Sequence, residues 1–247
     1  MWWDKKKKEP TSSSIQNVRD IFGRIYYDSE FTGLHRDSTL ISISLISQSG
    51  NYFYAEFNDY AKDQIDDWIQ EHVIGNLIFD KDCLIKHHAD TEGFDVDQFN
   101  IQMRGSKDEV KKEVVEWLKA ENSILKTKQV QIYSDCYAYD WMLLVDLIAG
   151  HAMKMPDFIN YIPIDLSSVL WVNGIDPDIS REEFAGISEN DVTNFDISLP
   201  EISSSKHNSF FDTISAKVCF EKIYQMIDKR RQVLQGAILK LGGRIDD

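Results

Sequence analysis

The sequence has little basic charge, few cysteines and no long apolar segment. Its 247 residues carry 41 Asp and Glu against 27 Lys and Arg, which gives a formal net charge of −14. Such an acidic chain binds nucleic acid or anionic membranes poorly through a broad basic face, although it is compatible with a local nucleic-acid site. No stretch approaches the ~20 apolar residues that a membrane-spanning helix needs. The composition therefore predicts no membrane partner and no unspecific binding of polyanions.

The cysteines are also widely separated. The chain has three, Cys83, Cys136 and Cys219, and this odd number predicts reduced thiols rather than a disulfide framework. Residues 1–10 contain a lysine run without the apolar region that a secretory signal needs. We therefore expect a cytoplasmic protein.

The chain has enough apolar residues to form a sizeable core. Hydrophobic residues make up 43% of it and aromatic residues 12%, which excludes a disordered, collagenous or coiled-coil protein. The length suits a single α/β domain with insertions, or at most two small domains. We interpret residues 1–22 as a flexible arm and residues 23–247 as one domain, with insertions near 78–104 and 173–206.

Local patterns predict a mixed sheet flanked by helices. The segments expected as strands are 24–31, 39–47, 52–57, 129–133 and 161–170, on alternation or short apolar runs. The segments expected as helices are 62–77, a helix capped by Ser106 that runs through Leu118, 138–149 and 212–241. The first three strands form an antiparallel meander, and strands and helices alternate after it. The fold class is therefore α/β, with a mixed five-stranded sheet.

Two carboxylates end the first strand. Alternation puts Asp28 and Glu30 on the same face, a few ångströms apart. Like charges held together are costly unless a cation lies between them, and hard oxygen ligands suit Mg²⁺ or Mn²⁺. The triplet alone is weak, because composition gives about 1.5 such triplets by chance, and solvated acids at a strand end are the better explanation of the triplet taken by itself.

Two further acids open helices. Asp140 lies in the first turn of an apolar helix, where it could simply complement the helix dipole, with Asp135 as the N-cap. Asp212 opens the C-terminal helix, and His207 precedes it by five residues in a polar loop. A lone histidine is usually a surface residue, but this spacing before a helix-opening acid is more informative.

Taken together, these pieces resemble the DEDDh 3′–5′ exonucleases of the RNase H-like superfamily. The resemblance rests on Asp28-x-Glu30 on a first strand, Asp140 at a helix start and His207-x₄-Asp212 near the end. The segment 30–34 is similar to that of oligoribonuclease and RNase T. Segments 67–77 and 137–140 are most similar to the RNase AS-like exoribonuclease branch.

The resemblance implies an RNase H-like fold and two-metal phosphodiester hydrolysis with two Mg²⁺ or Mn²⁺ ions. Asp28, Glu30 and Asp212 would hold one metal, and Asp28 would bridge to the second, with Asp140 near it. His207 would take the proton from the attacking water, because its intrinsic pKa suits that role. The expected activity is release of nucleoside 5′-monophosphates from the 3′-hydroxyl end of single-stranded RNA, by a homodimer.

The resemblance also implies that the segment after Glu30 binds the terminal nucleotide. Thr32 would contact the 3′ ribose, and Phe31 or Leu34 would pack on the base, with Gly33 allowing close backbone approach. Phe31 and Leu34 are alternatively core residues.

Several alternatives stay open. A 3′–5′ DNA exonuclease of phage or repair type would share the motifs, and so would a nucleic-acid-binding or scaffold protein without turnover. We expect Trp68, Trp117 and Trp141 in the core. The basic run 229–231 fits either the edge of a substrate channel or a solvated helix face.

Overall fold

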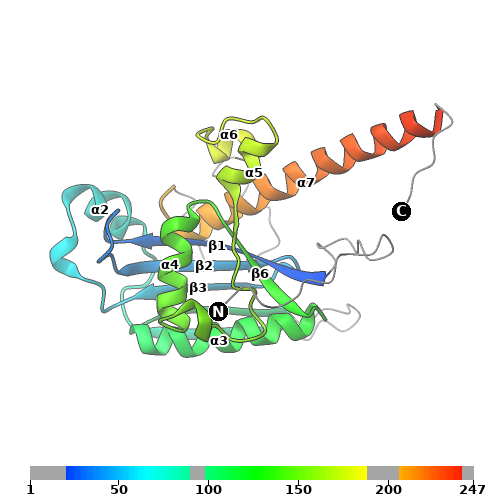
Figure 1. Ribbon diagram of the computed structural model, residues 1–247. Coiled ribbons are helices and arrows are strands. Elements are labelled where there is room, and N and C mark those ends of the chain that lie inside the picture. Colours follow the sequence, from blue (N-terminus) through cyan, green and yellow to red (C-terminus); the bar gives the residue numbers. More distant parts are fainter. Residues whose placement is uncertain (1–20, 90–97, 188–205, 241–247) are drawn as a thin grey trace, which may run out of the picture.

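A computed structural model of the chain describes residues 21–89, 98–187 and 206–240 (Figure 1). The predicted flexible arm, residues 1–22, lies almost entirely outside the described residues, and the first strand begins at Phe22. Most of the acidic segment within the expected insertion 173–206 lies outside them too. Among the described residues, no helix combines the length and the apolar character needed to cross a membrane.

The centre of the molecule is a mixed sheet of seven strands in the order β4-β5-β3-β2-β1-β6-β7. The strands are β1 (Phe22–Phe31), β2 (Leu40–Ser47), β3 (Tyr52–Phe57), β4 (Cys83–Ala89), β5 (Gln98–Gly105), β6 (Gln129–Ser134) and β7 (Ile164–Asp165). The predicted meander is confirmed, since β1 pairs antiparallel with β2 and β2 with β3. β6 lies parallel to β1 on its other side, and β7 lies parallel to β6.

The prediction of five strands is wrong, because β4 and β5 extend the sheet beyond β3. They pair antiparallel with each other, and β5 pairs parallel with β3. β4 and all but the last residue of β5 lie in the segment 78–104 that the sequence left as an insertion. β5 carries a period-two pattern in which Ile101 and Met103 are buried in the main core, but its partner in the sheet is about fifty residues away.

Helices cover both faces of the sheet. They are α2 (Asp67–His72), α3 (Lys107–Ile124), α4 (Tyr137–Ile148), α5 (Leu166–Val172), α6 (Arg181–Ala185) and α7 (Ser209–Lys240), with short 3₁₀ turns at 62–64, 74–76 and 152–154. α3 and α4 pack on one face, where the largest core cluster lies, and α7 packs on the other together with α5 and α6. The predicted capping box of Ser106 and Glu109 is present at the start of α3.

Two predicted elements differ in the structure. The segment 62–77 is interrupted, because the Asp66 carboxylate accepts a hydrogen bond from the Ile69 N–H at 2.8 Å and so starts the short helix α2 afresh. The segment 161–170 is a strand only at β7. Asp165 caps the following helix through the Ser168 N–H at 2.8 Å, which turns the rest of the segment into α5.

The long helix α7 extends well beyond the sheet. Its first half lies against β1 and β2, whereas its second half projects away from the body (Figure 1). The basic residues 229–231 lie on the projecting half and are exposed. They do not line the cavity described below, so the observation favours a solvated helix face over the edge of a substrate channel.

Candidate functional site

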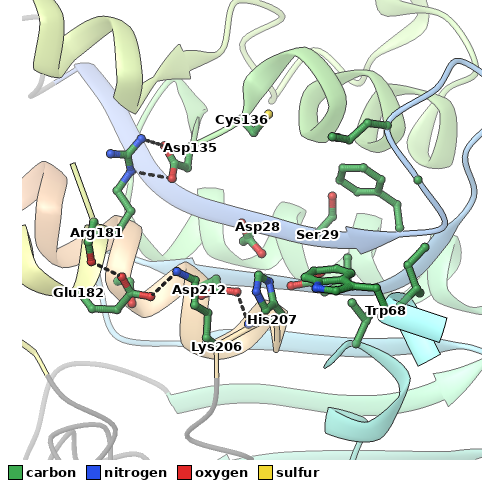
Figure 2. A pocket seen from close by; sticks show the side chains of 18 of the residues that line it. Asp28, Ser29, Trp68, Asp135, Cys136, Arg181, Glu182, Lys206, His207 and Asp212 are labelled. Carbon is green, nitrogen blue, oxygen red and sulfur yellow. Dashed lines mark hydrogen bonds and ion pairs between the residues drawn. The ribbon is translucent and has the colours of Figure 1, made fainter. Parts of the chain in front are cut away.

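A cavity of about 710 Å³ lies at the carboxyl end of β1 (Figure 2). Its walls come from β1, from α2, from the segment 178–182 and from the start of α7. The residues of the predicted site that line it are Asp28, Glu30, Phe31, Gly33, Leu34, His207 and Asp212. Thr32 and Asp140 do not line it. The structure therefore brings together side chains from two segments about 180 residues apart.

Asp28 and Glu30 point from β1 toward α7. They share one face of the strand, as the alternation predicted, and lie opposite Ser44 and Ser42 of β2. Those serines are not solvated, because the start of α7 covers them, and the Ser42 hydroxyl donates to the Ser209 hydroxyl at 2.9 Å. Small side chains on β2 let α7 lie close to the sheet. This close approach brings Asp212 within reach of the two strand acids.

Glu30, His207 and Asp212 form the tightest group. One potential ligand atom from each lies within 4.8 Å of the other two. The His207 backbone N–H also donates to the Asp212 carboxylate at 3.0 Å. This bond ties the loop before α7 to the acid in the first turn of the helix.

The acids of the site repel one another in a poorly solvated place. Burial raises the pKa of Asp28 and Glu30 well above the usual range, and the neighbouring acids raise it further, Asp140 and Asp212 among them. Burial also raises the pKa of Asp212 to about 7, although the His207 N–H opposes this shift. Carboxylates held together in this way need protons or a cation. Their hard oxygen atoms fit Mg²⁺ or Mn²⁺.

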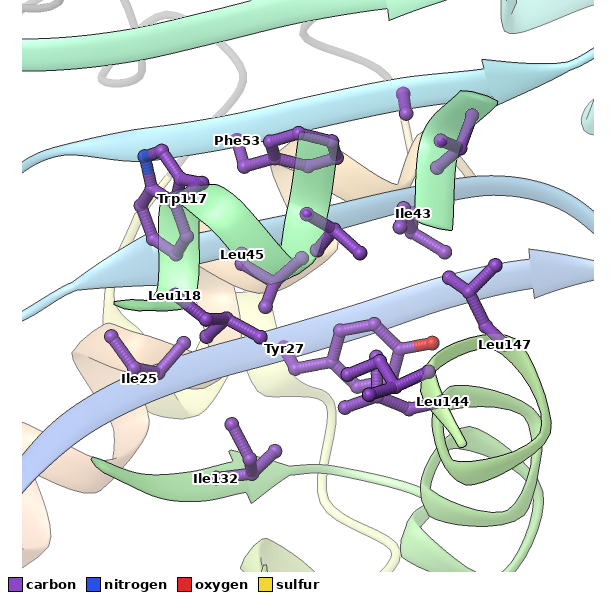
Figure 3. Packing of buried hydrophobic residues seen from close by; sticks show 14 of the residues in the cluster. Ile25, Tyr27, Ile43, Leu45, Phe53, Trp117, Leu118, Ile132, Leu144 and Leu147 are labelled. Carbon is purple, nitrogen blue, oxygen red and sulfur yellow. The ribbon is translucent and has the colours of Figure 1, made fainter. Parts of the chain in front are cut away.

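Asp140 approaches from the other side of β1. Tyr27 on that side lies beside Leu144 of α4 and belongs to the same buried cluster as Ile25 (Figure 3). Asp140 is 1% exposed. Its carboxylate accepts hydrogen bonds from the Ser29 hydroxyl at 2.6 Å and the Cys136 N–H at 3.3 Å.

Asp140 was expected to be a metal ligand, but its side chain does not line the cavity. Burial raises its pKa to about 7, against the opposing hydrogen bond from Ser29. Its charge still reaches the site, because it raises the pKa of Asp28 and of Glu30. In this arrangement Asp140 fixes the strand that carries both acids.

Asp135 is not the N-cap of α4. The helix begins after Cys136, without a side-chain cap. Asp135 instead lines the cavity and forms a two-pronged ion pair with Arg181, whose Nε and Nη2 donate at 2.7 and 2.8 Å. This pairing offsets part of the charge of Asp135, although its carboxylate still helps to raise the pKa of Asp28 and of Asp140.

His207 is held against two aromatic rings. Its ring meets the edge of Trp68 at 4.9 Å between centroids, and Trp68 stacks on His72 at 4.9 Å. Its backbone φ is +65°, a left-handed conformation that few residues other than glycine adopt. Burial, followed by the charges of Lys206 and His72, lowers the pKa of the imidazole below its usual value. A neutral ring near pH 7 can accept a proton.

The loop after β1 is anchored to α4. Phe31 stacks on Tyr139 at 5.6 Å between centroids, and the Tyr139 hydroxyl donates to the Leu34 carbonyl at 3.2 Å. Leu34 is 73% exposed, so it is not a core residue. Gly33 has a φ of +153°, which suits glycine.

Thr32 has a different environment from the one expected. Its side chain is buried, bonds to Gln64 and accepts the Thr39 N–H at 2.9 Å. The side chain is thereby committed to partners inside the protein. The expected contact between this side chain and a ribose is not supported by its position.

Sequence reasoning missed several residues of the cavity. Trp68 was expected in the core but is 50% exposed and lines the cavity, whereas Trp117 and Trp141 are buried as predicted. Arg181 and Lys206 also line it. Lys206 could have been predicted from the sequence, because it directly precedes His207. Nothing local in the sequence indicated Arg181.

No protein-family model matches the chain, and no curated protein is significantly similar to it.

Proposed function

We propose that the protein is a metal-dependent 3′–5′ exoribonuclease with an RNase H-like fold. It would hydrolyse single-stranded RNA from the 3′-hydroxyl end and release nucleoside 5′-monophosphates. The observation that carries the proposal is the meeting of Asp28 and Glu30 from β1 with His207 and Asp212 from the start of α7 in one cavity. Each of these residues has the chemistry that phosphodiester hydrolysis with divalent cations requires.

The carboxylates provide the cation ligands of the proposal. Asp28, Glu30 and Asp212 would hold the first Mg²⁺ or Mn²⁺, and Asp28 would also contact the second. Bound divalent cations stabilise the charge on the attacking and leaving oxygens of a phosphodiester. The raised pKa values of the acids support this assignment, because two cations would relieve their mutual repulsion.

His207 would be the general base. Its lowered pKa keeps the ring neutral near pH 7, so a ring nitrogen can accept the proton of the attacking water. Its backbone bond to Asp212 keeps the ring beside the acids. The edge of Trp68 limits the rotation of the ring.

The loop 31–34 would receive the 3′-terminal nucleotide. Leu34 offers an exposed aliphatic side chain at the cavity, and Trp68, which also lines it, offers an exposed indole. Apolar and aromatic groups bind bases with little dependence on sequence. The cavity therefore suits a single-stranded end better than a long duplex.

The arrangement of the central strands supports the RNase H-like assignment. β3, β2 and β1 form the antiparallel meander, and β6 and β7 continue the sheet in parallel with β1. β4 and β5 would be an addition to that core.

The proposed homodimer rests on the resemblance alone, and light scattering coupled to size-exclusion chromatography tests it.

The test is incubation with 3′-labelled single-stranded RNA and DNA in the presence of Mg²⁺, Mn²⁺ or EDTA. We expect release of labelled 5′-monophosphates from RNA that EDTA abolishes. Asp28→Ala should abolish release as well, whereas Asp157→Ala, at an exposed turn outside the cavity, should leave it unchanged. Faster release from DNA would favour a DNA exonuclease, and no release from either polymer would leave only a binding or scaffold role.

A further inference from the structure

The cavity has few basic side chains that could bind a polyanionic substrate. Among the described residues that line it, the basic side chains are Arg181, Lys206 and His207. The acids of the site cannot bind a phosphate directly, and His207 is assigned to accept the proton of the attacking water. A strand in the cavity therefore has two fixed positive charges available to it.

Arg181 is already saturated with partners. Its guanidinium donates to both oxygens of Asp135, to the Ser167 hydroxyl at 3.1 Å, and to the carbonyls of Pro177 at 2.9 Å and Ile179 at 2.6 Å. A phosphate at this side chain would have to break a two-pronged ion pair that is partly buried. Arg181 therefore shapes the wall of the cavity rather than binding the substrate.

Lys206 is in the opposite situation. Its side chain is 60% exposed, and its ammonium forms an ion pair with Glu182 at 3.5 Å, longer than a strong hydrogen bond (Figure 2). Glu182 would not be left alone by its departure, because the Ser180 hydroxyl donates to the other carboxylate oxygen at 2.7 Å. The partner of Lys206 can thus be exchanged at low cost.

The backbone holds Lys206 next to the reacting groups. The Asn76 side chain donates to the Lys206 carbonyl at 3.0 Å, and the Asn208 side chain donates to the Asn76 carbonyl at 3.0 Å. Lys206 directly precedes His207. A flexible side chain on a fixed backbone can follow a phosphate without moving the imidazole.

We propose that Lys206 binds a backbone phosphate of the substrate strand and exchanges Glu182 for it. This inference rests on the proposed function and adds to it a residue that determines the affinity for the strand. In the free protein, Glu182 holds the ammonium at the wall of the cavity. In the complex, the phosphate takes its place.

The test measures binding rather than turnover. The probe is a fluorescein-labelled RNA of about ten nucleotides, within the site size of single-strand-binding proteins, with phosphorothioate linkages to slow hydrolysis. Fluorescence anisotropy at several KCl concentrations gives Kd and its salt dependence. We expect Lys206→Met to weaken binding about five- to tenfold and to reduce the slope of log Kd against log [KCl] by about 0.7, the loss of one phosphate contact.

Matched variants separate a specific contact from a general loss of charge. Lys206→Arg should keep most of the affinity, and Lys111→Met, at an exposed position of α3 outside the cavity, should change neither quantity. Glu182→Gln should tighten binding in the natural chain and have a smaller effect in the Lys206→Met background. Lys206→Gln is a second variant should Lys206→Met not fold.

The outcomes also separate this inference from the proposed function. If the protein releases nucleotides but Lys206→Met binds like Lys111→Met, the assignment of Lys206 is overturned alone. If the Lys206 effects appear without metal-dependent release, the phosphate contact stands and the exonuclease proposal fails. No binding by the natural chain would overturn both.

Discussion

At the scale of single residues, the position of His207 is fixed from several sides. Its backbone bonds to Asp212, its ring meets Trp68, and the carbonyl of the preceding residue is bound by Asn76. A left-handed backbone at a residue other than glycine is costly and persists where surrounding contacts enforce it. These contacts keep a neutral imidazole beside the acids.

We expect His207→Ala to bind RNA normally and to lose at least about 100-fold in turnover, the usual contribution of a general base. His87→Ala is the matched control, since His87 is exposed on β4 and lies outside the cavity. Single-turnover rates and anisotropy measure the two effects separately. Full turnover in the His207 variant would refute the base assignment.

The acids and the histidine of the cavity could be predicted as candidates, because acids at a strand end and at a helix start, with a histidine five residues before one of them, stand out in the sequence. Trp68 could not, since its apolar spacing with Ile69 and Val73 is equally typical of a core helix. Its exposure follows from the interruption of that helix at Asp66. Arg181 depends on a contact with Asp135 across 46 residues, for which no local pattern exists.

At the scale of elements, the first turn of α4 supports the end of β1 from the opposite face. Asp140 binds Ser29, and Tyr139 binds both Phe31 and the Leu34 carbonyl. Ser29 lies between the two strand acids, so its bond to α4 fixes both of their positions. The helix thereby acts on the site without facing the cavity.

We expect Ser29→Ala to lower the free energy of unfolding by about 1–3 kcal/mol, because a buried carboxylate oxygen loses its donor. The melting temperature should fall by several degrees, and the nuclease rate should fall with it. Ser29→Thr keeps the hydroxyl and should restore both, whereas Ser123→Ala, at an exposed position of α3, should change neither. An unchanged melting temperature in Ser29→Ala would contradict the support from α4.

The meander and α3 could be predicted because local patterns specify them: alternation in β2, and a capping box at Ser106. β5 shows why the rest could not. Its pairing with β3 places Ile101 beside Phe53, and no local pattern specifies a parallel partner so far away. The strand expected over 161–170 is much shorter in the structure, because Asp165 caps a helix that begins within that segment.

At the scale of the whole molecule, the net charge of −14 is compatible with a nucleic-acid partner. Asp28, Glu30 and Asp212 line the cavity, and together with Asp140 behind them they account for four of the 41 acidic residues. Two divalent cations would supply four positive charges there. Affinity would then come from the cations, Lys206 and recognition of the strand end, rather than from a broad basic face.

The same acids make stability depend on pH. The pKa of Asp212 and of Asp140 is about 7 in the folded chain, against a usual value of 3.8. The folded state therefore binds more protons than the unfolded state between these values, so the free energy of unfolding falls as pH rises through this window.

Without divalent cations, we expect the melting temperature to be higher near about pH 5 than near about pH 8. Added Mg²⁺ or Mn²⁺ should raise it more at the higher pH, because cations bind the ionised carboxylates. Asp212→Asn should weaken both the pH dependence of the melting temperature and its increase with Mg²⁺ or Mn²⁺. A melting temperature that rises with pH in EDTA would contradict the shared acid site.

The central claim is stepwise hydrolysis from a 3′-hydroxyl end at the site of Asp28, Glu30, His207 and Asp212. The most direct measurement is a time course with 5′-labelled single-stranded RNA carrying either a 3′-hydroxyl or a 3′-phosphate, resolved at single-nucleotide length. We expect a ladder that shortens one nucleotide at a time, requires Mg²⁺ or Mn²⁺, and is strongly reduced by the 3′-phosphate. Cleavage at internal positions, equal cleavage of both ends, or shortening in EDTA would contradict it.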